Sequence, residues 1–446
     1  MNAAISGQSE ARDDSGSRAL IACHECDLLQ RESAVPPGGV LRCCRCHAVL
    51  YRRRGSGFDR ALAFAVAACI LWVISNARPI VGLAVNGDVV ETTLIGAVRV
   101  LYRDGMWPLA GLIFVTVILM PALQAFGTVW LLLPLQLGRR PYRAEGVFRL
   151  LRIARDWGMT EVLMLGLLVA LVKLAHIAAV VTGPALWSLA ALMMLLVAAT
   201  SAYDERAMWM RIQGPPPGLP EDTPLHGRTA AENGICVCHD CGLSTRGTLK
   251  HGHLCCPRCG SHLHLRKTAS LSRTWALLSA AAILYIPANM LPVMNTSSLF
   301  GAQKDTILSG VVYLWQSGSW PLAIVVFIAS IAVPMLKILA IGYLATSANL
   351  RATQRSTLRA RIYRVVEFVG RWSMLDIYVI AVLVALVQFS ALATIEAGPA
   401  SIAFGSVVVL TMFAAMSFDP RLIWDPQTPS GRPSGTPPEA IREAPQ

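Results

Sequence analysis

The chain has 446 residues, of which 54% are hydrophobic and only 15% are charged, and its formal net charge is +12. Soluble globular proteins carry about 25% charged residues, so this composition argues against a soluble domain and for a membrane protein. A net positive charge is compatible with nucleic-acid binding, but the arginines cluster beside apolar runs, where they set membrane topology. Nucleic acid is therefore not an expected partner.

Two pairs of cysteines open the first expected domain, residues 19–54. The polar segment before it, 1–18, lacks the apolar stretch of a secretory signal and is expected to be disordered. Each Cys-x-x-Cys pair turns both sulfurs toward one ion, and the segment between the pairs returns the chain to that ion. Because so small a domain cannot bury enough core to fold alone, a bound ion can supply the missing stability. The predicted four-thiolate ligands are Cys23, Cys26, Cys43 and Cys46.

Apolar runs follow, and residues 55–211 are the first expected membrane module. Runs of about 20 apolar residues are long enough to cross a bilayer as helices. Four spans are predicted, at 58–82, 106–137, 158–181 and 185–203. A short hairpin is expected over 85–93, because the residues alternate loosely around a turn-forming Asn-Gly-Asp sequence.

The second half repeats this plan. Residues 212–232 are rich in Pro, Gly and Thr and indicate a flexible linker. Residues 233–268 carry two further Cys-x-x-Cys pairs at a similar separation, and predict a second site formed by Cys238, Cys241, Cys256 and Cys259. Residues 269–424 are the second module, with spans predicted at 273–294, 319–346, 373–395 and 401–418. The Pro-rich tail, 425–446, is expected to be disordered.

Residues of rare types recur at a fixed spacing, which indicates a duplication. Six of them recur in the second half at one constant offset: Asn76, Pro79, Gly105, Trp107, Pro108 and Pro121 match Asn289, Pro292, Gly318, Trp320, Pro321 and Pro334. Pro121 and Pro334 fall within spans and predict matching kinks. The predicted fold is an all-α integral membrane protein of two tandem repeats. Each repeat is a small cytoplasmic zinc-ribbon or rubredoxin-like domain followed by a four-helix membrane module, with eight spans in total, and the two copies have the same orientation.

Charge placement predicts the topology. Arginines crowd the connection between the second and third spans of each copy, at 139–155 and 351–371, whereas 83–104 and 295–318 carry few basic residues. The positive-inside rule therefore places both termini, both cysteine domains and both arginine-rich loops in the cytoplasm. Because thiols stay reduced there, disulfides are disfavoured and metal binding is the better interpretation of the cysteines.

Zn²⁺ is the preferred ion at both sites, and iron is the alternative. Four thiolates suit either metal, and the segment 256–260, Cys-Pro-Arg-Cys-Gly, resembles the iron-binding knuckle of rubredoxins. His24 and His239 hold matching positions, but a ligand role is disfavoured because four thiolates already complete a tetrahedron. The cysteines left out of the ligand set are Cys44, Cys236 and Cys255, which are not shared between the copies, and Cys69, which lies in an apolar span.

Polar side chains within the spans are the candidates for a transport path. Lys337 and Asp376 are expected at similar depth in the sixth and seventh spans and could meet, although snorkelling and helix capping explain them equally well. Lys173 lies about 20 Å into the third span at 1.5 Å per residue, where snorkelling is harder. Asn76 and Asn289 each precede a proline by three residues and can bond freed carbonyls, although a plain helix exit is the better explanation.

The whole combination resembles the paraquat-inducible protein A family, also called PqiA or LetA. The resemblance covers about residues 20–424 and is carried by the twin cysteine domains, the Asn-x-x-Pro segments at 76 and 289, the Gly-x-Trp-Pro segments at 105 and 318, and Trp-Ser-Met-Leu-Asp at 372–376. It implies an inner-membrane protein of Gram-negative bacteria with zinc-ribbon domains in the cytoplasm. It also implies a periplasmic partner that bears MCE domains. The first copy has only a weaker version of the last motif, at 157–161, so the second half is the better candidate for the working site.

The resemblance thus implies a component of an intermembrane lipid-transport system, not an enzyme, which passes membrane lipids to or from the MCE-domain protein and supports envelope integrity. The sequence has no Gly-x-x-x-x-Gly-Lys-Ser/Thr motif, so ATP hydrolysis through a P-loop is excluded. The alternative is a redox-active membrane protein that uses iron–thiolate sites in an oxidative-stress response. A membrane scaffold or sensor is a third hypothesis.

Overall fold

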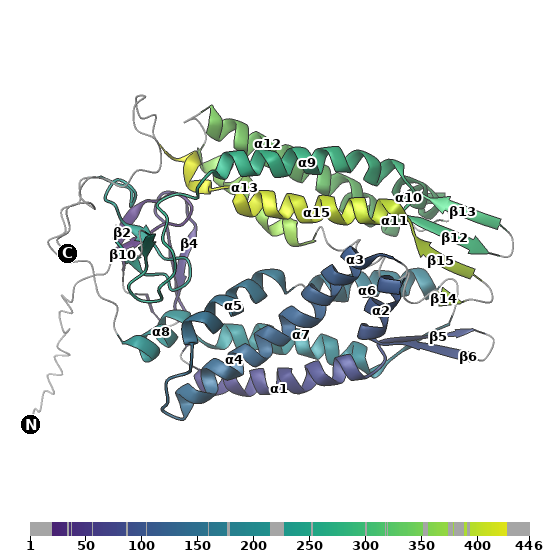
Figure 1. Cartoon of the computed structure of the whole chain (residues 1–446), viewed down its shortest axis with the longest axis horizontal. Helices are drawn as coiled ribbons and strands as arrows, with labels where there is room; N and C mark the ends of the chain where they lie inside the picture. The colour runs from purple at the N-terminus through teal and green to yellow at the C-terminus, as the bar shows by residue number, and fades with distance from the viewer. Residues whose placement is uncertain are drawn as a thin grey trace, which may run out of the picture.

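The computed structural model describes residues 20–425, apart from 34, 37, 56, 86–87, 104, 159, 176–178, 215–226, 251–252, 299–300, 317, 319, 351–355, 373–377, 379–387 and 390–392. Two helical modules lie side by side along the long axis, with the cysteine domains at one end and small sheets at the other (Figure 1). We call these the ribbon end and the strand end. Because α1 (Phe58–Ala77) and α9 (Ser270–Met290) both run from the ribbon end to the strand end, the two copies are parallel.

Equivalent helices build the two modules. After α1, the first module contains α2 (Leu94–Arg103), α3 (Trp107–Ile113), η1 (Phe114–Leu119), α4 (Met120–Gln136), α5 (Ala144–Trp157), α6 (Thr160–Ala175), α7 (Pro184–Ala202) and α8 (Glu205–Gln213). After α9, the second contains α10 (Ile307–Gln316), α11 (Trp320–Phe327), η2 (Ile328–Ala332), α12 (Val333–Asn349), α13 (Ser356–Trp372), α15 (Pro399–Ser417) and the 3₁₀ turn η3 (Pro420–Ile423).

Prolines set several helix boundaries. α1 ends at Ala77 and α9 at Met290 because the next residue in each case precedes a proline and is extended. At Pro121 and Pro334, where the sequence predicts kinks, the structure has π-helical turns, η1 and η2, each of which ends two residues before the proline. Proline has no N–H for the carbonyl four residues earlier, so the α-helical ladder is interrupted at these points.

Within the described part of the chain, six helices are long and apolar enough to cross a membrane: Phe58–Ala77, Trp107–Gln136, Pro184–Ala202, Ser270–Met290, Ala323–Asn349 and Pro399–Ser417. They correspond to six of the eight predicted spans. The predicted third span, 158–181, extends too far, because α6 ends at Ala175 and β7 (Ala179–Thr182) follows. Most of the predicted seventh span, 373–395, lies outside the described residues, and its end at 393–395 is strand rather than helix.

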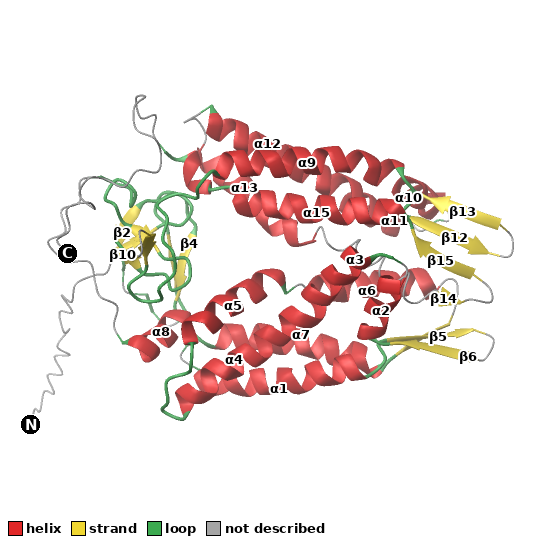
Figure 2. Ribbon diagram, in the orientation of Figure 1, coloured by secondary structure: helices red, strands yellow, loops and turns green. Residues whose placement is uncertain are grey.

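A small antiparallel sheet closes each module at the strand end, so the chain is mostly helical rather than all-α (Figure 2). In the first module, the strands lie in the order β6-β5-β7, and the predicted hairpin is present as β5 (Val81–Val85) and β6 (Asp88–Thr92). In the second module, the order is β13-β12-β15-β14. These strands are β12 (Met294–Ser298), β13 (Gly301–Asp305), β14 (Gln388–Phe389) and β15 (Ala393–Ala397).

Close helix packing holds each module together, and a few contacts join the two. Ala61, Ala65 and Ala68 form a fully buried stripe on α1, which packs on α7, because small side chains let helix backbones approach each other. Between the modules, the hydroxyl of Tyr378 donates to Thr116 Oγ1 of η1 at 2.8 Å, and both side chains are buried.

Each cysteine domain is a pair of short hairpins, which we call the first ribbon (residues 20–54) and the second ribbon (227–268). The first contains β1 (Leu20–Ala22), β2 (Leu29–Arg31), β3 (Val40–Arg42) and β4 (Val49–Arg52), and the second contains β8 (Cys236–Val237), β9 (Ser244–Thr245), β10 (Thr248–Lys250) and β11 (His253–Cys255). The segments expected to be disordered, 1–18 and 425–446, lie outside the described residues except for Asp425. So does 215–226 of the predicted linker.

Candidate metal centres and polar membrane residues

In the first ribbon, the four predicted cysteines converge at one buried point. Cys23 Sγ lies 3.5 Å from Cys46 Sγ, and Cys26 Sγ lies 3.5 Å from Cys43 Sγ. The β1–β2 and β3–β4 hairpins each contribute one knuckle, which positions two sulfurs. The four sulfurs lie within 4.8 Å of one another, so the spacing of the cysteines correctly predicted the cluster.

The second ribbon repeats this arrangement. Cys238 Sγ lies 3.4 Å from Cys259 Sγ, and Cys241 Sγ lies 3.6 Å from Cys256 Sγ. Gly242 and Gly260 close the two knuckles with φ of 71° and 68°, in the left-handed region that favours glycine. The equivalent residues of the first ribbon, Asp27 and His47, also have positive φ, at 61° and 60°, which costs more for a residue with a side chain.

These clusters fit a tetrahedral thiolate-bound ion. Four sulfurs at about 2.3 Å from a zinc ion lie about 3.8 Å from one another, close to the separations found here. All the cysteines, which lie in the described part of the chain, are free rather than disulfide-bonded. Hydrogen bonding with Cys23 raises the pKa of Cys26 and lowers the pKa of Cys46, so the sulfurs hold their protons with unequal strength. A bound cation would replace these protons.

The other thiols and the knuckle histidines lie outside both clusters. Cys236 is buried, and this burial raises the pKa of its thiol to about 11, so it stays protonated at neutral pH. Cys44 is exposed and contacts Gln30 Oε1 at 3.3 Å. Burial and, to a smaller extent, the positive charge of Arg421 lower the pKa of His239 to about 4.

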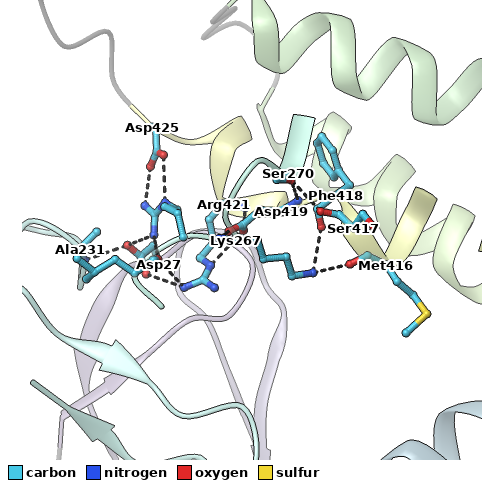
Figure 3. A network of polar contacts seen from close by, with 12 residues as sticks. Asp27, Ala231, Lys267, Ser270, Met416, Ser417, Phe418, Asp419, Arg421 and Asp425 are labelled. Carbon is cyan, nitrogen blue, oxygen red and sulfur yellow. Dashed lines mark hydrogen bonds and ion pairs between the residues drawn. The ribbon is translucent and has the colours of Figure 1, made fainter. Parts of the chain in front are cut away.

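A polar network holds the ribbons together and attaches them to the second module (Figure 3). Asp27, only 2% exposed, accepts hydrogen bonds from Arg266 Nη1 at 2.9 Å and from the Ala231 backbone N–H at 3.0 Å. Arg266 also donates to Asp425 at 2.6 Å, and Arg421 lies 3.8 Å from Asp27. Burial raises the pKa of the Asp27 carboxyl, while the charge of Arg266 opposes that shift.

The transport-path candidates Lys337 and Asp376 differ in what the structure describes of them. Lys337 of α12 is 2% exposed, and its Nζ has no hydrogen-bond partner among the described residues. Gly370 of α13 lies beside it, since a Cβ there would be 3.9 Å from Lys337 Nζ. Asp376 lies outside the described residues, so its pairing with Lys337 stays a prediction.

Lys173 lies 13 residues after the start of α6, which is about 20 Å at 1.5 Å per residue and agrees with the depth expected from the sequence. It lies in the last turn of α6, two residues before the helix ends at Ala175 near the strand end. The chain then continues into β7, so the apolar run that suggested a longer helix contains both a helix and a strand. The proposed role of Lys173 in a transport path therefore stays a prediction, while the predicted end of the third span was too late because a short apolar strand extends the hydropathy of the helix before it.

Asn76 and Asn289 bond backbone carbonyls at the ends of α1 and α9. Asn76 Nδ2 donates to the Trp72 carbonyl at 2.8 Å, and Asn289 Nδ2 donates to the Tyr285 carbonyl at 2.9 Å. These bonds fit the helix-exit explanation. The Oδ1 of Asn76 is buried without a partner among the described residues.

A pair of equivalent hydrogen bonds to the π turns was not foreseen from the sequence. Trp72 Nε1 donates to the Ile118 carbonyl of η1 at 3.1 Å, and the Tyr285 hydroxyl donates to the Ile331 carbonyl of η2 at 3.1 Å. Donors and acceptors alike are separated by the same offset that relates Asn76 to Asn289, so they hold equivalent positions in the two copies. Because the two donors are a tryptophan and a tyrosine, identical residues in the two copies do not reveal this pair.

Comparison with known proteins supports one family. The sequence profile of the family Paraquat-inducible protein A matches residues 58–213 and 271–428. The Intermembrane transport protein PqiA of Escherichia coli K12 is 37% identical over 412 residues, which cover 92% of this chain and 96% of that protein. The Lipophilic envelope-spanning tunnel protein A of the same strain is 30% identical over 405 residues, 90% of each chain. A Probable intermembrane transport protein of Haemophilus influenzae is 28% identical over 410 residues, 91% of this chain and 95% of that protein. No solved structure gives a significant match.

Proposed function

Because the chain belongs to the paraquat-inducible protein A family and is a multi-pass membrane protein, we propose that it is an inner-membrane component of an intermembrane lipid-transport system. It passes lipid to or from a periplasmic MCE-domain partner and supports the integrity of the envelope. The observation that carries this proposal is the identity of 37% over 92% of the chain to a protein named for intermembrane transport. The relative named as a lipophilic, envelope-spanning tunnel protein supports lipid as the cargo.

We further propose that each ribbon holds one Zn²⁺ through its four cysteines. Bound zinc supplies structural stability and no redox chemistry, since Zn²⁺ has no accessible second oxidation state. Sulfur separations of 3.4–3.6 Å support one ion per cluster. Elemental analysis of the purified chain tests the proposal: about two zinc ions per chain and no visible absorbance are expected, whereas iron–thiolate absorbance would favour the redox alternative.

We also propose the predicted topology, with eight spans and with both termini and both ribbons in the cytoplasm. The arginine-rich helices α5 and α13 lie toward the ribbon end, which supports this orientation through the positive-inside rule. The proposed domain boundaries are 19–54 and 233–268 for the ribbons, and 55–211 and 269–424 for the modules. A membrane-impermeant thiol reagent applied to intact spheroplasts should leave Cys44 unlabelled, although its side chain is exposed. Labelling of Cys44 under these conditions would reverse the orientation.

The transport path is proposed to use Lys337 with Asp376, and Lys173, Asn76 and Asn289 are the secondary candidates. Support comes from the burial of Lys337 in an apolar helix, because a charged side chain within a membrane span is costly and often marks a functional site. Ser330 and Thr411 add buried hydroxyls on η2 and α15, and α15 packs against α12, so the second module has several polar groups along its interior.

The decisive experiment purifies the chain from membranes and identifies the lipids and proteins that accompany it by mass spectrometry. Wild type is expected to retain phospholipid and an MCE-domain protein. Lys337→Gln introduces the residue found at the matching position, Gln124, and is expected to abolish envelope protection with unchanged expression. Leu336→Gln, which adds the same amide on a side chain 60% exposed, is the matched control and should retain protection. Full protection by Lys337→Gln, or purification without lipid, contradicts the proposal.

A further inference from the structure

The first knuckle of each ribbon carries a carboxylate that binds the membrane module of the other copy. Arg364 of α13, in the second module, binds Glu25 with its Nε at 2.9 Å and its Nη2 at 2.8 Å. Arg149 of α5, in the first module, binds Asp240 with its Nε at 3.2 Å. The offset from Glu25 to Asp240 equals the offset from Arg149 to Arg364, so the two ion pairs are equivalent and crossed.

A second pair of contacts crosses in the same way. The guanidinium of Arg45, in the first ribbon, lies 4.5 Å from the ring centre of Trp424, which follows the second module. The guanidinium of Arg258, in the second ribbon, lies 5.5 Å from the ring centre of Trp209 on α8 of the first module. These residues also occupy equivalent positions in the two copies, since each arginine lies within the second knuckle of its ribbon. Such a contact between a cation and an aromatic ring is stabilising, and more so when it is desolvated.

Apolar packing reinforces the crossed arrangement. The four cysteines of the second ribbon share one buried cluster with Phe148 of α5 and Trp209 of α8, both in the first module. The cysteines of the first ribbon pack on Trp424, whose other neighbours include Phe418 and Ile423 at the end of the second module. The second ribbon therefore shares a buried core with the first module, and the first ribbon packs on an aromatic side chain at the end of the second module.

Each ribbon is also attached to the module that follows it in the sequence. Tyr51 of the first ribbon donates a hydrogen bond to Asp204 before α8, and the guanidinium of Arg206 lies 4.2 Å from the Tyr51 ring centre. Lys267, at the end of the second ribbon, donates from Nζ to the Met416 carbonyl at 2.6 Å (Figure 3). Both ribbons consequently contact both modules.

From these contacts, we infer that the two ribbons form a crossed brace, in which each metal-binding knuckle clamps the opposite module and the pair holds the modules together at the ribbon end. At the strand end, the described sheets of the two modules do not pair with each other. The modules meet there through the packing of α3 on α15, with Ser401 Oγ 3.8 Å from Met106 Sδ, and not through ion pairs among the described residues. The inference goes beyond the transport proposal and does not depend on which ion occupies the clusters. It predicts that a substitution in one module exposes the cysteines encoded by the other half.

The two clamps differ in burial, which predicts unequal effects. The carboxylate of Glu25 is 10% exposed and that of Asp240 is 20% exposed, while the arginines are 35% and 50% exposed, respectively. Removing one partner of a buried ion pair leaves the other charge unpaired, which is costly, whereas exposed pairs contribute little. Loss of Arg364 is therefore expected to release the first ribbon more than loss of Arg149 releases the second.

Alkylation of the cysteines in the purified full-length chain, resolved by peptide mass spectrometry in the presence of a mild chelator, tests the brace. Arg364→Glu is expected to raise the labelling rate of Cys23, Cys26, Cys43 and Cys46 about tenfold or more, with little change in the second ribbon. Arg149→Glu should raise the labelling of Cys238, Cys241, Cys256 and Cys259 by a smaller factor. Arg361→Glu, an exposed arginine on the same helix as Arg364, is the matched control and should match wild type.

The opposite pattern, in which Arg364→Glu exposes the second ribbon, would overturn the inference, and so would labelling indistinguishable from that of Arg361→Glu. If Arg364→Glu labels both ribbons because the chain has unfolded, the charge exchange Glu25→Arg with Arg364→Glu decides. Restored protection of the first ribbon in this double variant supports the brace, and continued labelling refutes it. None of these readouts requires lipid transport.

Discussion

One glycine in each module lies so close to a neighbouring carbonyl that adding a single methyl group should be destabilising. Gly183, before α7, donates its N–H to the Ile80 carbonyl at 2.8 Å. A Cβ at this position would lie 2.1 Å from the Pro79 carbonyl oxygen, and one at the equivalent Gly398 would lie 2.2 Å from that of Pro292. The φ of both glycines is −81°, which any residue adopts, so Gly183→Ala tests steric overlap alone.

The expected cost follows from the overlap. Ordinary van der Waals contact of a Cβ begins at 3.4 Å, so the Pro79 carbonyl would have to move by about 1 Å. This carbonyl also accepts the Ala185 N–H at 3.2 Å, and the shift would weaken that bond. Overpacking costs about 1–3 kcal/mol and a weakened hydrogen bond about 1 kcal/mol, so Gly183→Ala should destabilise the first module by about 3 kcal/mol.

Thermal unfolding in detergent, followed by tryptophan fluorescence, measures this effect. For a unit of about 150–250 residues, each kcal/mol shifts the midpoint by about 2–4 °C, so a fall of about 6–12 °C is expected. Gly111→Ala is the control, because a Cβ on this α3 glycine meets nothing within 4 Å and alanine favours a helix by about 0.5–1 kcal/mol. Equal midpoints for Gly183→Ala and Gly111→Ala would refute the steric reasoning.

Other features of the structure give further predictions. Trp72→Phe removes the donor to the Ile118 carbonyl at the π turn and should lower the free energy of unfolding by about 1–3 kcal/mol. Tyr285→Phe should have the same effect in the second copy, where it removes the donor to the Ile331 carbonyl. An unchanged free energy of unfolding in a denaturant titration of either variant would show that the π turns need no such donor. Burial raises the pKa of Asp419, but the charge of Arg421 and two backbone N–H donors bring it below the ordinary 3.8, so the ionised carboxylate stabilises the fold above that pH. The midpoint difference between wild type and Asp419→Asn should therefore be full at pH 5–7 and shrink as the pH falls below about 4; a difference independent of pH would contradict this assignment. Complete removal of the proposed metal by a strong chelator should lower the melting temperature of the whole chain, because the second cluster shares a buried core with the first module and the first cluster packs on Trp424. An unchanged melting curve after verified metal loss would show that the fold does not depend on the ions.

The cysteine clusters and most helices could be predicted from the sequence because local patterns specify them. Cys-x-x-Cys spacing determines how two sulfurs turn toward one ion. An apolar run of about 20 residues can adopt few structures other than a membrane-spanning helix. The strands at 179–182 and 393–397 could not be predicted in the same way, since their apolar residues continue the runs before them and short apolar segments are ambiguous between helix and strand.

The crossed docking of the ribbons could not be predicted, for a different reason. The repeat in the sequence shows that Glu25 corresponds to Asp240 and Arg149 to Arg364, but it is equally consistent with pairing inside each half. Only the three-dimensional arrangement reveals that Glu25 meets Arg364. Similarly, the buried position of Lys337 follows from the packing of α12 against its neighbours, whereas hydropathy alone allows its ammonium group to reach the interface.

The reciprocal ion pairs have a consequence for each half of the chain by itself. A fragment ending within 215–226 would carry the Glu25 knuckle and Arg149 but neither of their partners. Two such fragments related by a two-fold axis would form the missing ion pairs with each other, as domain-swapped protomers do. Covalent connection of the halves makes this association intramolecular, so its strength no longer depends on protein concentration. A half-length chain is thus expected to form these ion pairs only as a homodimer, whereas the full chain forms them within one molecule.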